Sequence, residues 1–290
     1  YIGYGLIVAL LAVFLIFVGQ NVPGALSKQE IASVVQGAAI DRADHASFAI
    51  ANAPYHRLQQ RSIELLGVSV LGIKLPSLII AFITSIGAVL LLRRWFHANI
   101  AVLATLLMIT TGQFLYVAQS GTASIILIMW SVWLLLAATM ITNKETRHPR
   151  AWKAAFFLMA GFSLYAPLSL YLLVAIISAA LLHPHVRFVL KSMNSRSLAV
   201  YGFLMVIPVA PLAYLISLRP EFLLELLGKP EIWPPDILAN GARLLRGYFD
   251  FLTLPSGNLL TPVFGAGSVA LIILGAWQLA RTHYNARSYT

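Results

Sequence analysis

The sequence contains no cysteine, so disulfide frameworks and thiolate metal sites are excluded. Charge is also scarce, because Asp, Glu, Lys and Arg make up 10% of the chain, whereas soluble domains average about 25%. Hydrophobic residues account for 59% of the chain, which leaves too little polar surface to cover a domain in water. These scarcities predict an all-α, polytopic membrane protein.

The patterns of nucleotide-binding and nucleic-acid-binding domains are absent as well. The sequence has no G-x-G-x-x-G turn and no alternating strand pattern, both of which a βαβ nucleotide site requires. The net charge of +10 is not gathered in a soluble basic domain, so we expect no nucleic-acid partner. The chain opens at Tyr1 without Met or a basic leader, and we expect its true start to lie upstream.

Long uncharged apolar runs fill most of the chain. A helix of about 20 residues crosses a bilayer core, and we predict eight spans at residues 2–18, 75–92, 100–117, 122–142, 152–165, 168–183, 198–218 and 262–280. The uncharged stretch 154–182 is too long for one span, and Pro167 in its middle predicts a tight helical hairpin. We expect a single transmembrane domain over residues 1–290, with outer loops at about 21–74 and about 219–261.

The distribution of charge predicts the orientation of these spans. Eleven of the twenty basic residues and a single acid, Glu145, fall on one side of the eight-span arrangement. The other side holds nine basic and nine acidic residues, so the first side carries the whole net charge of +10. Because basic residues accumulate in cytoplasmic loops, we predict a multi-pass protein of a bacterial or archaeal plasma membrane, with both termini in the cytoplasm.

The first outer loop is predicted to form two amphipathic helices. Ser27-x-x-Glu30 is a capping box that begins the first helix, and apolar residues at helical spacing continue it to Ala39. A second helix is expected after Pro54, with leucines among its charged residues. Helices of this kind lie along a membrane surface, with their charged faces at headgroup depth.

Short motifs follow one another through the first half of the chain. They are Gln29-Glu30, Asn52-Ala53-Pro54-Tyr55-His56, Gly67-Val68-Ser69, Ile73-Lys74-Leu75-Pro76-Ser77, Arg93-Arg94-Trp95-Phe96 and Gln119-Ser120-Gly121-Thr122. In this order they resemble the GT-C superfamily of membrane glycosyltransferases, in the branch of protein O-mannosyltransferases and lipid A aminoarabinose transferases. The family pattern is an Asp-Glu pair, a Pro-Pro-like turn, G-x-S, R-L-P-S, R-R-x-F and A-R-x-G-x-x-D, and the resemblance covers residues 1–142.

The resemblance implies inverting transfer of a sugar from a polyprenyl-phosphate donor to an acceptor hydroxyl on the outer face. It also implies that an outer-loop carboxylate is the base or a metal ligand, and Glu30 matches the Glu of the family pair. Gln29 stands where the family has Asp, Ser124 where a second acid often sits, and Lys74 where Arg is usual. We predict that Glu30 is the catalytic base, with a purely capping role as the alternative.

Four arginines of the two outer loops are candidates for binding the donor phosphate. Guanidinium forks suit planar anions, and Arg57 and Arg61 lie one turn apart on the second predicted helix. Arg243 and Arg246 are the candidates in the later loop. The alternative for the first pair is a surface ion pair between Arg61 and Glu64 together with lipid headgroup contacts.

The remaining candidates are polar or aromatic. The predicted substrate contacts are Gln29, His56, Ser124 and Trp233. Trp233 equally suits the aromatic belt at a membrane interface. Asp41 and Asp44 could hold a divalent cation, Mg or Mn, and are otherwise solvated loop charges. The expected partners are membrane lipids and a polyprenyl-phosphate sugar, and the acceptor stays open among protein, lipid and glycan.

Two other functional classes stay open. A degenerate homologue that binds a lipid-linked sugar or scaffolds partners is favoured by Gln29 and Ser124, because neither is an acid. A secondary transporter would need charged or broken helices at the membrane midplane. The predicted spans contain almost no ionisable residue, which disfavours a transporter.

Overall fold

The computed structural model is all-helical over the residues that it describes, which confirms the predicted fold class for that part of the chain. Apart from the isolated positions 9 and 13, the described residues are 26–41, 43–142, 148–182, 195–229, 236–242 and 266–281. The span predicted at 2–18 therefore lies outside them, and so do Trp233, Arg243 and Arg246.

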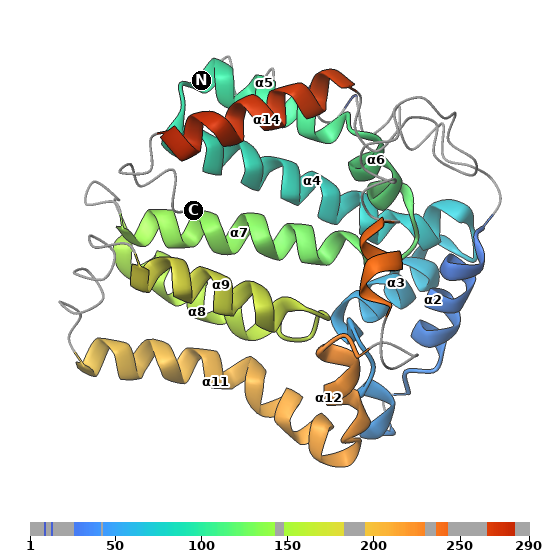
Figure 1. Ribbon diagram of the computed structural model, residues 1–290. Coiled ribbons are helices and arrows are strands. Elements are labelled where there is room, and N and C mark those ends of the chain that lie inside the picture. The colour runs from blue at the N-terminus through green and yellow to red at the C-terminus, as the bar shows by residue number, and fades with distance from the viewer. Residues whose placement is uncertain are drawn as a thin grey trace.

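The apolar helices are α4 (Val70–Trp95), α5 (Ala98–Ile109), α6 (Gly112–Gln119), α7 (Ile125–Thr142), α8 (Pro149–Ser163), α9 (Ser169–Leu182), α11 (Ser195–Leu218) and α14 (Ala266–Arg281). Of these, α4, α7, α8 and α11 lie side by side in that order and form a layer (Figure 1). α4 packs against α7, α7 against α8, and α8 against α11, while α5 flanks α4 and α9 contacts both α7 and α8. These helices coincide with seven of the eight predicted spans.

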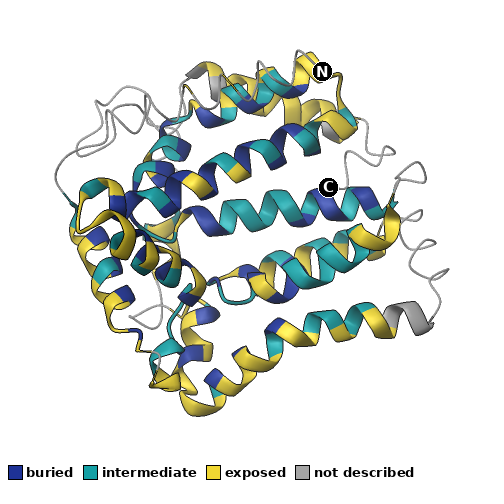
Figure 2. Ribbon diagram, turned by 180° about the vertical axis from the view of Figure 1, so that it is seen from behind, coloured by how far each residue is buried: buried dark blue, intermediate teal, exposed yellow. Residues whose placement is uncertain are grey.

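Burial falls steadily across this layer (Figure 2). In the most apolar stretch of each helix, 61% of residues are buried in α4, 33% in α7 and 17% in α11. Among the residues that the structure describes, three helices are long and apolar enough to cross a bilayer, or four if the bent pair α5 and α6 forms one span. The exposed apolar side chains suit contact with lipid, and the count of eight spans stays a prediction.

The span predicted at 100–117 is broken in the structure. α5 and α6 meet at an angle of 66°. The hydroxyl of Thr111 donates to the carbonyl of Met108 (2.7 Å) and accepts from the N–H of Phe114 (3.3 Å), so it ends one helix and caps the next. Hydroxyl groups compete locally for backbone partners, and hydropathy alone did not predict this break.

The break predicted around Pro167 is confirmed, because α8 ends at Ser163 and α9 begins at Ser169. In the turn between them Leu168 has φ +65°, and its N–H donates to the carbonyl of Leu226 (2.9 Å). The turn is thereby joined to the short helix α12 (Glu221–Leu226).

A cap of short helices covers one end of the layer (Figure 1). It consists of α2 (Lys28–Ala38), the 3-10 helix η1 (His45–Phe48), α3 (Ala53–Leu66) and α12. α2 packs on α3, α3 on α4, and η1 on α11. The described parts of the two predicted outer loops therefore share one end of the layer, while their side of the membrane stays a prediction.

α2 and α3 meet through their polar faces. The hydroxyl of Ser33 donates to Oε1 of Gln59 (3.0 Å), and Gly37 lies against the backbone of His56. The apolar side chains of α2 point outward, because Ile31 is 51% exposed and Val35 is 61% exposed. This arrangement suits a helix that rests its apolar face on a membrane surface.

Candidate functional site

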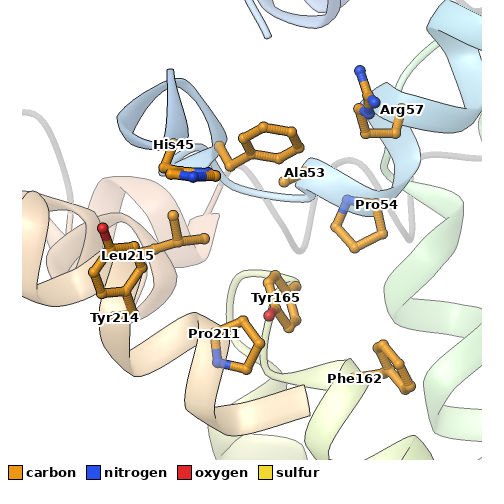
Figure 3. Close-up of a pocket in the computed structure, with 10 residues that line it drawn as sticks. His45, Ala53, Pro54, Arg57, Phe162, Tyr165, Pro211, Tyr214 and Leu215 are labelled. Atoms are coloured by element: carbon orange, nitrogen blue, oxygen red, sulfur yellow. The ribbon is translucent and has the colours of Figure 1, made fainter. Parts of the chain in front are cut away.

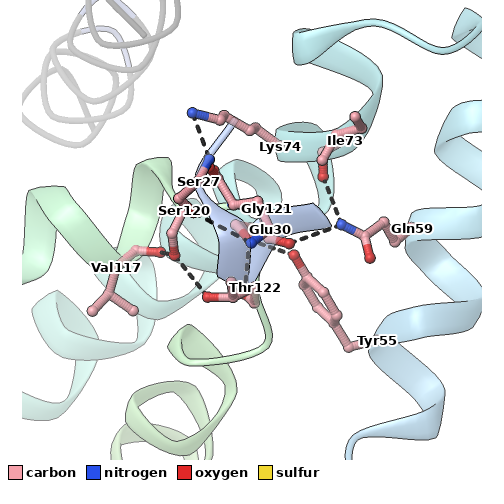
Figure 4. Close-up of polar contacts among 11 residues, drawn as sticks. Ser27, Glu30, Tyr55, Gln59, Ile73, Lys74, Val117, Ser120, Gly121 and Thr122 are labelled. Carbon is pink, nitrogen blue, oxygen red and sulfur yellow. Dashed lines mark hydrogen bonds and ion pairs between the residues drawn. The ribbon is translucent and has the colours of Figure 1, made fainter. Parts of the chain in front are cut away.

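Glu30 lies in a buried polar network where the cap meets the layer (Figure 4). Its Oε2 accepts from the N–H of Ser27 (2.7 Å), and its Oε1 accepts from the N–H of Gly121 (2.8 Å). The Nζ of Lys74 lies 3.1 Å from the same Oε1. The hydroxyl of Ser27 in turn accepts from the N–H of Glu30 (3.2 Å), so the predicted capping box is confirmed.

The surroundings of Glu30 favour a structural role. The side chains of Glu30 and Lys74 are each 4% exposed. Burial raises the pKa of Glu30, but the hydrogen bonds from Ser27, Gly121 and Lys74 outweigh it, so the pKa lies below its ordinary value. A carboxylate with three donors and a lowered pKa is a weak proton acceptor. Catalysis by Glu30 stays a prediction, and this geometry matches the capping alternative.

Gln59 connects three segments beside this ion pair. It is fully buried, and its Nε2 donates to the carbonyls of Ile73 (3.1 Å) and Gly121 (2.9 Å). A Cβ on Gly121 would lie 2.7 Å from Cγ2 of Ile73, so only glycine lets this backbone approach both Glu30 and Gln59.

Two sets of hydroxyl groups meet at Thr122, one bonded to its backbone carbonyl and the other to its side chain. The hydroxyl of Tyr55 lies 2.7 Å from that of Ser77, which donates to the carbonyl of Thr122 (3.1 Å). The hydroxyl of Thr122 lies 2.9 Å from that of Ser120 and 3.1 Å from that of Ser124. These hydrogen bonds end at Ser124, which directly precedes the first residue of α7.

A polar cavity of about 530 Å³ lies between α2, α3, the start of α7 and the turn before α9. It brings together Gln29, His56 and Ser124, three of the four predicted substrate contacts. The described residues that line it include no Asp, Glu, Lys or Arg. Its polar groups are therefore amides, hydroxyls and one imidazole, which suit an uncharged, hydroxyl-rich ligand.

His56 is the titratable side chain among the described residues of this lining. It is 3% exposed, and its Nδ1 is itself buried. Burial lowers the pKa of His56 and outweighs the hydrogen bonds with Ser33, Gln59 and Ala51, which raise it, so the imidazole is neutral near pH 7. Asn52 and Leu168, which also line the cavity, have φ values of +58° and +65°. Such conformations cost roughly 1–3 kcal/mol and cluster at functional sites.

A second, apolar cavity of about 380 Å³ adjoins the start of α3 (Figure 3). Phe48, Tyr165 and Tyr214 are among the residues that line it. Arg57 borders it with its guanidinium 5.3 Å from the ring centre of Phe48, and donates to Oε1 of Gln60 (2.7 Å). The first turns of α3 thus contribute Arg57 to the apolar cavity and His56 to the polar one.

The two arginines predicted as a phosphate clamp have different surroundings. Arg61 lies 2.7 Å from Glu64 on the surface, where the two side chains are 56% and 43% exposed. This is the surface ion pair given above as the alternative, whereas Arg57 borders a cavity. Arg243 and Arg246 lie outside the described residues.

Asp41 and Asp44 each cap a local turn. Oδ1 of Asp41 accepts from the N–H of Ala43 (3.0 Å), and Oδ1 of Asp44 accepts from the N–H of Ala46 (2.9 Å). Within the described ranges, no group of three or more His, Asp or Glu side chains could hold a metal ion. The described residues here do not fit a three-ligand cation site, and the cation stays a prediction.

Several residues of this region were not predicted from the sequence. Gln59 stands in no motif, Asn52 and Tyr55 belong to a motif but were given no role, and the partner of Lys74 was not identified. One sequence feature could have identified Gln59. His56, Gln59 and Ser62 form a polar stripe at helical spacing on α3, and this stripe is buried.

A comparison with protein families matches residues 54–212 to the dolichyl-phosphate-mannose-protein mannosyltransferase family. The matched part begins within α3 and includes His56, Arg57 and Ser124, whereas Gln29 and Glu30 precede it. No curated protein and no solved structure matches the chain. Because the family match covers more than half of the sequence, the chain belongs to the dolichyl-phosphate-mannose-protein mannosyltransferase family, within the GT-C superfamily of membrane glycosyltransferases.

Proposed function

We propose that this protein transfers a sugar from a polyprenyl-phosphate donor to an acceptor hydroxyl at the outer membrane face. The polar cavity at the cap is the observation that carries the proposal. It is large enough for a sugar ring, and its walls combine uncharged hydrogen-bonding groups with apolar side chains. The chain that forms it belongs to a family of glycosyltransferases. Amide and hydroxyl groups suit sugar hydroxyls, which both donate and accept hydrogen bonds.

The apolar cavity suits the lipid part of the donor. Its walls are aromatic and aliphatic, and Arg57 borders it with a guanidinium that could bind a phosphate. His56 and Arg57 are consecutive and line different cavities, and we place the donor with its phosphate at Arg57 and its sugar in the polar cavity. Exposed Ile31 and Leu58 would rest the cap on the bilayer that supplies this donor.

In the proposed reaction the acceptor oxygen attacks the anomeric carbon from the face opposite the phosphate, which inverts that centre. Arg57 stabilises the negative charge that develops on the departing polyprenyl phosphate. The cation predicted at Asp41 and Asp44 enters no step, because each carboxylate caps a turn. To test for the cation, sugar transfer is measured after EDTA treatment and again after Mg²⁺ or Mn²⁺ is added. If transfer by the double variant Asp41→Asn, Asp44→Asn still requires the cation, the cation binds elsewhere.

The donor is tested with purified protein in lipid vesicles and an acceptor extract. We expect transfer from a polyprenyl-phosphate sugar and none from the matching nucleotide sugar. Arg57→Ala should weaken donor binding by about 10-fold or more, the scale of a lost charge-assisted contact. Arg61→Ala is the matched control, because Arg61 lies in an exposed pair. Transfer from the nucleotide sugar alone would contradict the proposal.

A second candidate function is binding without transfer. The absence of carboxylates among the described residues that line the polar cavity favours it, because Gln29 and Ser124 occupy positions where the family has acids. Mass spectrometry of the purified protein separates the two candidates. A retained polyprenyl-phosphate sugar that is never consumed by any acceptor extract would support binding alone.

A further inference from the structure

The polar cavity is enclosed by segments that are far apart in the chain, and Asn52 lies where two of them meet. Asn52 lines this cavity, and its backbone N–H donates to the carbonyl of Tyr165 (2.8 Å) in the turn before α9. The next residues, Ala53 and Pro54, line the apolar cavity instead, as does the ring of Tyr165 (Figure 3). Asn52 therefore lies at the boundary between the cavity that we assign to the sugar and the cavity that we assign to the lipid.

The backbone of Asn52 is fixed in an unusual conformation. Its φ of +58° and ψ of +31° place it in the left-handed region, which Asn tolerates better than most residues. Leu168, the other non-glycine residue with a positive φ in the described part of the chain, lines the same cavity. The carbonyl of Asn52 accepts from the N–H groups of Tyr55 (2.8 Å) and His56 (3.2 Å). Hydrogen bonds on both sides of Asn52 thus fix the position from which its side chain extends.

The side chain of Asn52 lacks the local partners that are usual at the start of a helix. An N-cap side chain accepts from the backbone N–H of the second or third helical residue. In α3 these residues are Pro54, which has no N–H, and Tyr55, whose N–H already donates to the carbonyl of Asn52. Asn52 accordingly makes no side-chain capping bond, whereas Ser27 and Ser69 cap α2 and α4 in the usual way. Its half-buried amide is left without a hydrogen bond to any described residue.

We propose that the amide of Asn52 binds the sugar of the lipid-linked donor, an inference that rests on the function proposed above. An amide offers a carbonyl acceptor and two N–H donors, so it matches a sugar hydroxyl, which both donates and accepts hydrogen bonds. Arg57 lies on the same helix and borders the apolar cavity. Arg57 then holds the phosphate and Asn52 holds the sugar, on opposite sides of the boundary between the two cavities.

Asn52→Gly separates the amide from the backbone conformation. Glycine adopts a positive φ without steric cost, so the variant should melt within about 4 °C of wild type. Its affinity for a polyprenyl-phosphate sugar, titrated by native mass spectrometry, should fall by about threefold or more, the scale of a lost hydrogen bond. Its affinity for the same polyprenyl phosphate without the sugar should not change. Arg57→Ala should weaken both ligands, whereas Asn99→Gly, at an exposed position of α5 that borders neither of the two cavities, should weaken neither ligand.

Three results would overturn the assignment while leaving the proposed function intact. The first is an affinity of Asn52→Gly for the sugar-bearing donor that stays within about threefold of wild type. The second is equal weakening of polyprenyl phosphate with and without the sugar, because the amide would then not act on the sugar. The third is a melting temperature lower by more than about 4 °C, which would indicate a packing role for the amide. Failure of the proposed function is distinct, because wild type itself would then transfer no sugar from the lipid-linked donor.

Discussion

Replacement of Lys74 by Met should destabilise the protein severely. Met keeps the length of the side chain and removes its charge, which leaves the Glu30 carboxylate buried with two backbone donors and no cation. Removing one partner of a buried ion pair costs about 3–5 kcal/mol. Since two hydrogen bonds to Glu30 remain, we expect the lower end, about 3 kcal/mol, and a melting temperature lower by roughly 6–12 °C.

A double-mutant cycle assigns this loss to the ion pair. Thermal unfolding in detergent, followed by circular dichroism, is measured for Lys74→Met, Glu30→Gln and the double variant. The double variant should recover part of the stability, because no unpaired charge stays buried, although the Gln amide can accept from only one of the two backbone N–H groups that Glu30 binds. Arg61→Met is the matched control, because the exposed pair of Arg61 with Glu64 is worth about 0–1 kcal/mol.

The pH dependence provides a second measurement on the same variants. The pKa of Glu30 is lower in the folded protein than in the unfolded chain, so its stabilising effect is present above the unfolded value of about 4.3 and is lost as the pH falls through the folded value. Glu30→Gln should reduce this loss of stability at acidic pH. The reasoning is refuted if Lys74→Met melts within about 2 °C of wild type, or if the double variant is no more stable than either single variant.

The remaining predictions concern packing and topology. Gly121→Ala should cost about 1–3 kcal/mol in thermal unfolding, because its Cβ would lie 2.7 Å from Ile73. Gly202→Ala, which meets open space in α11, should be neutral or stabilise by up to about 1 kcal/mol, and equal losses in both would contradict the packing argument. The absence of cysteine permits single-cysteine labelling in intact cells, where an impermeant reagent should modify Val68→Cys and spare Arg150→Cys. Labelling at 150 but not at 68 would reverse the predicted orientation.

The amino-acid sequence by itself determined the helical class and the placement of most helices. Hydropathy and charge act locally, so uncharged apolar runs became α4, α7 and α11 without reference to the rest of the chain. The capping box of Ser27 and Glu30 and the helix break around Pro167 are local as well, since each depends on backbone groups within a few residues. The motifs were sufficient to indicate the family to which the chain belongs.

Only the tertiary structure decided which of the candidate residues share a site. Glu30 bonds to Gly121, 91 positions away, and this contact withdraws its carboxylate from the cavity. Arg57 and Arg61 share a helix, yet the packing of η1 and α11 beside the start of α3 brings only Arg57 to a cavity. Gln29, His56 and Ser124 line one cavity because α2, α3, the start of α7 and the turn before α9 meet there. Burial and hydrogen bonding depend on segments far apart in the chain, so local sequence patterns cannot specify them.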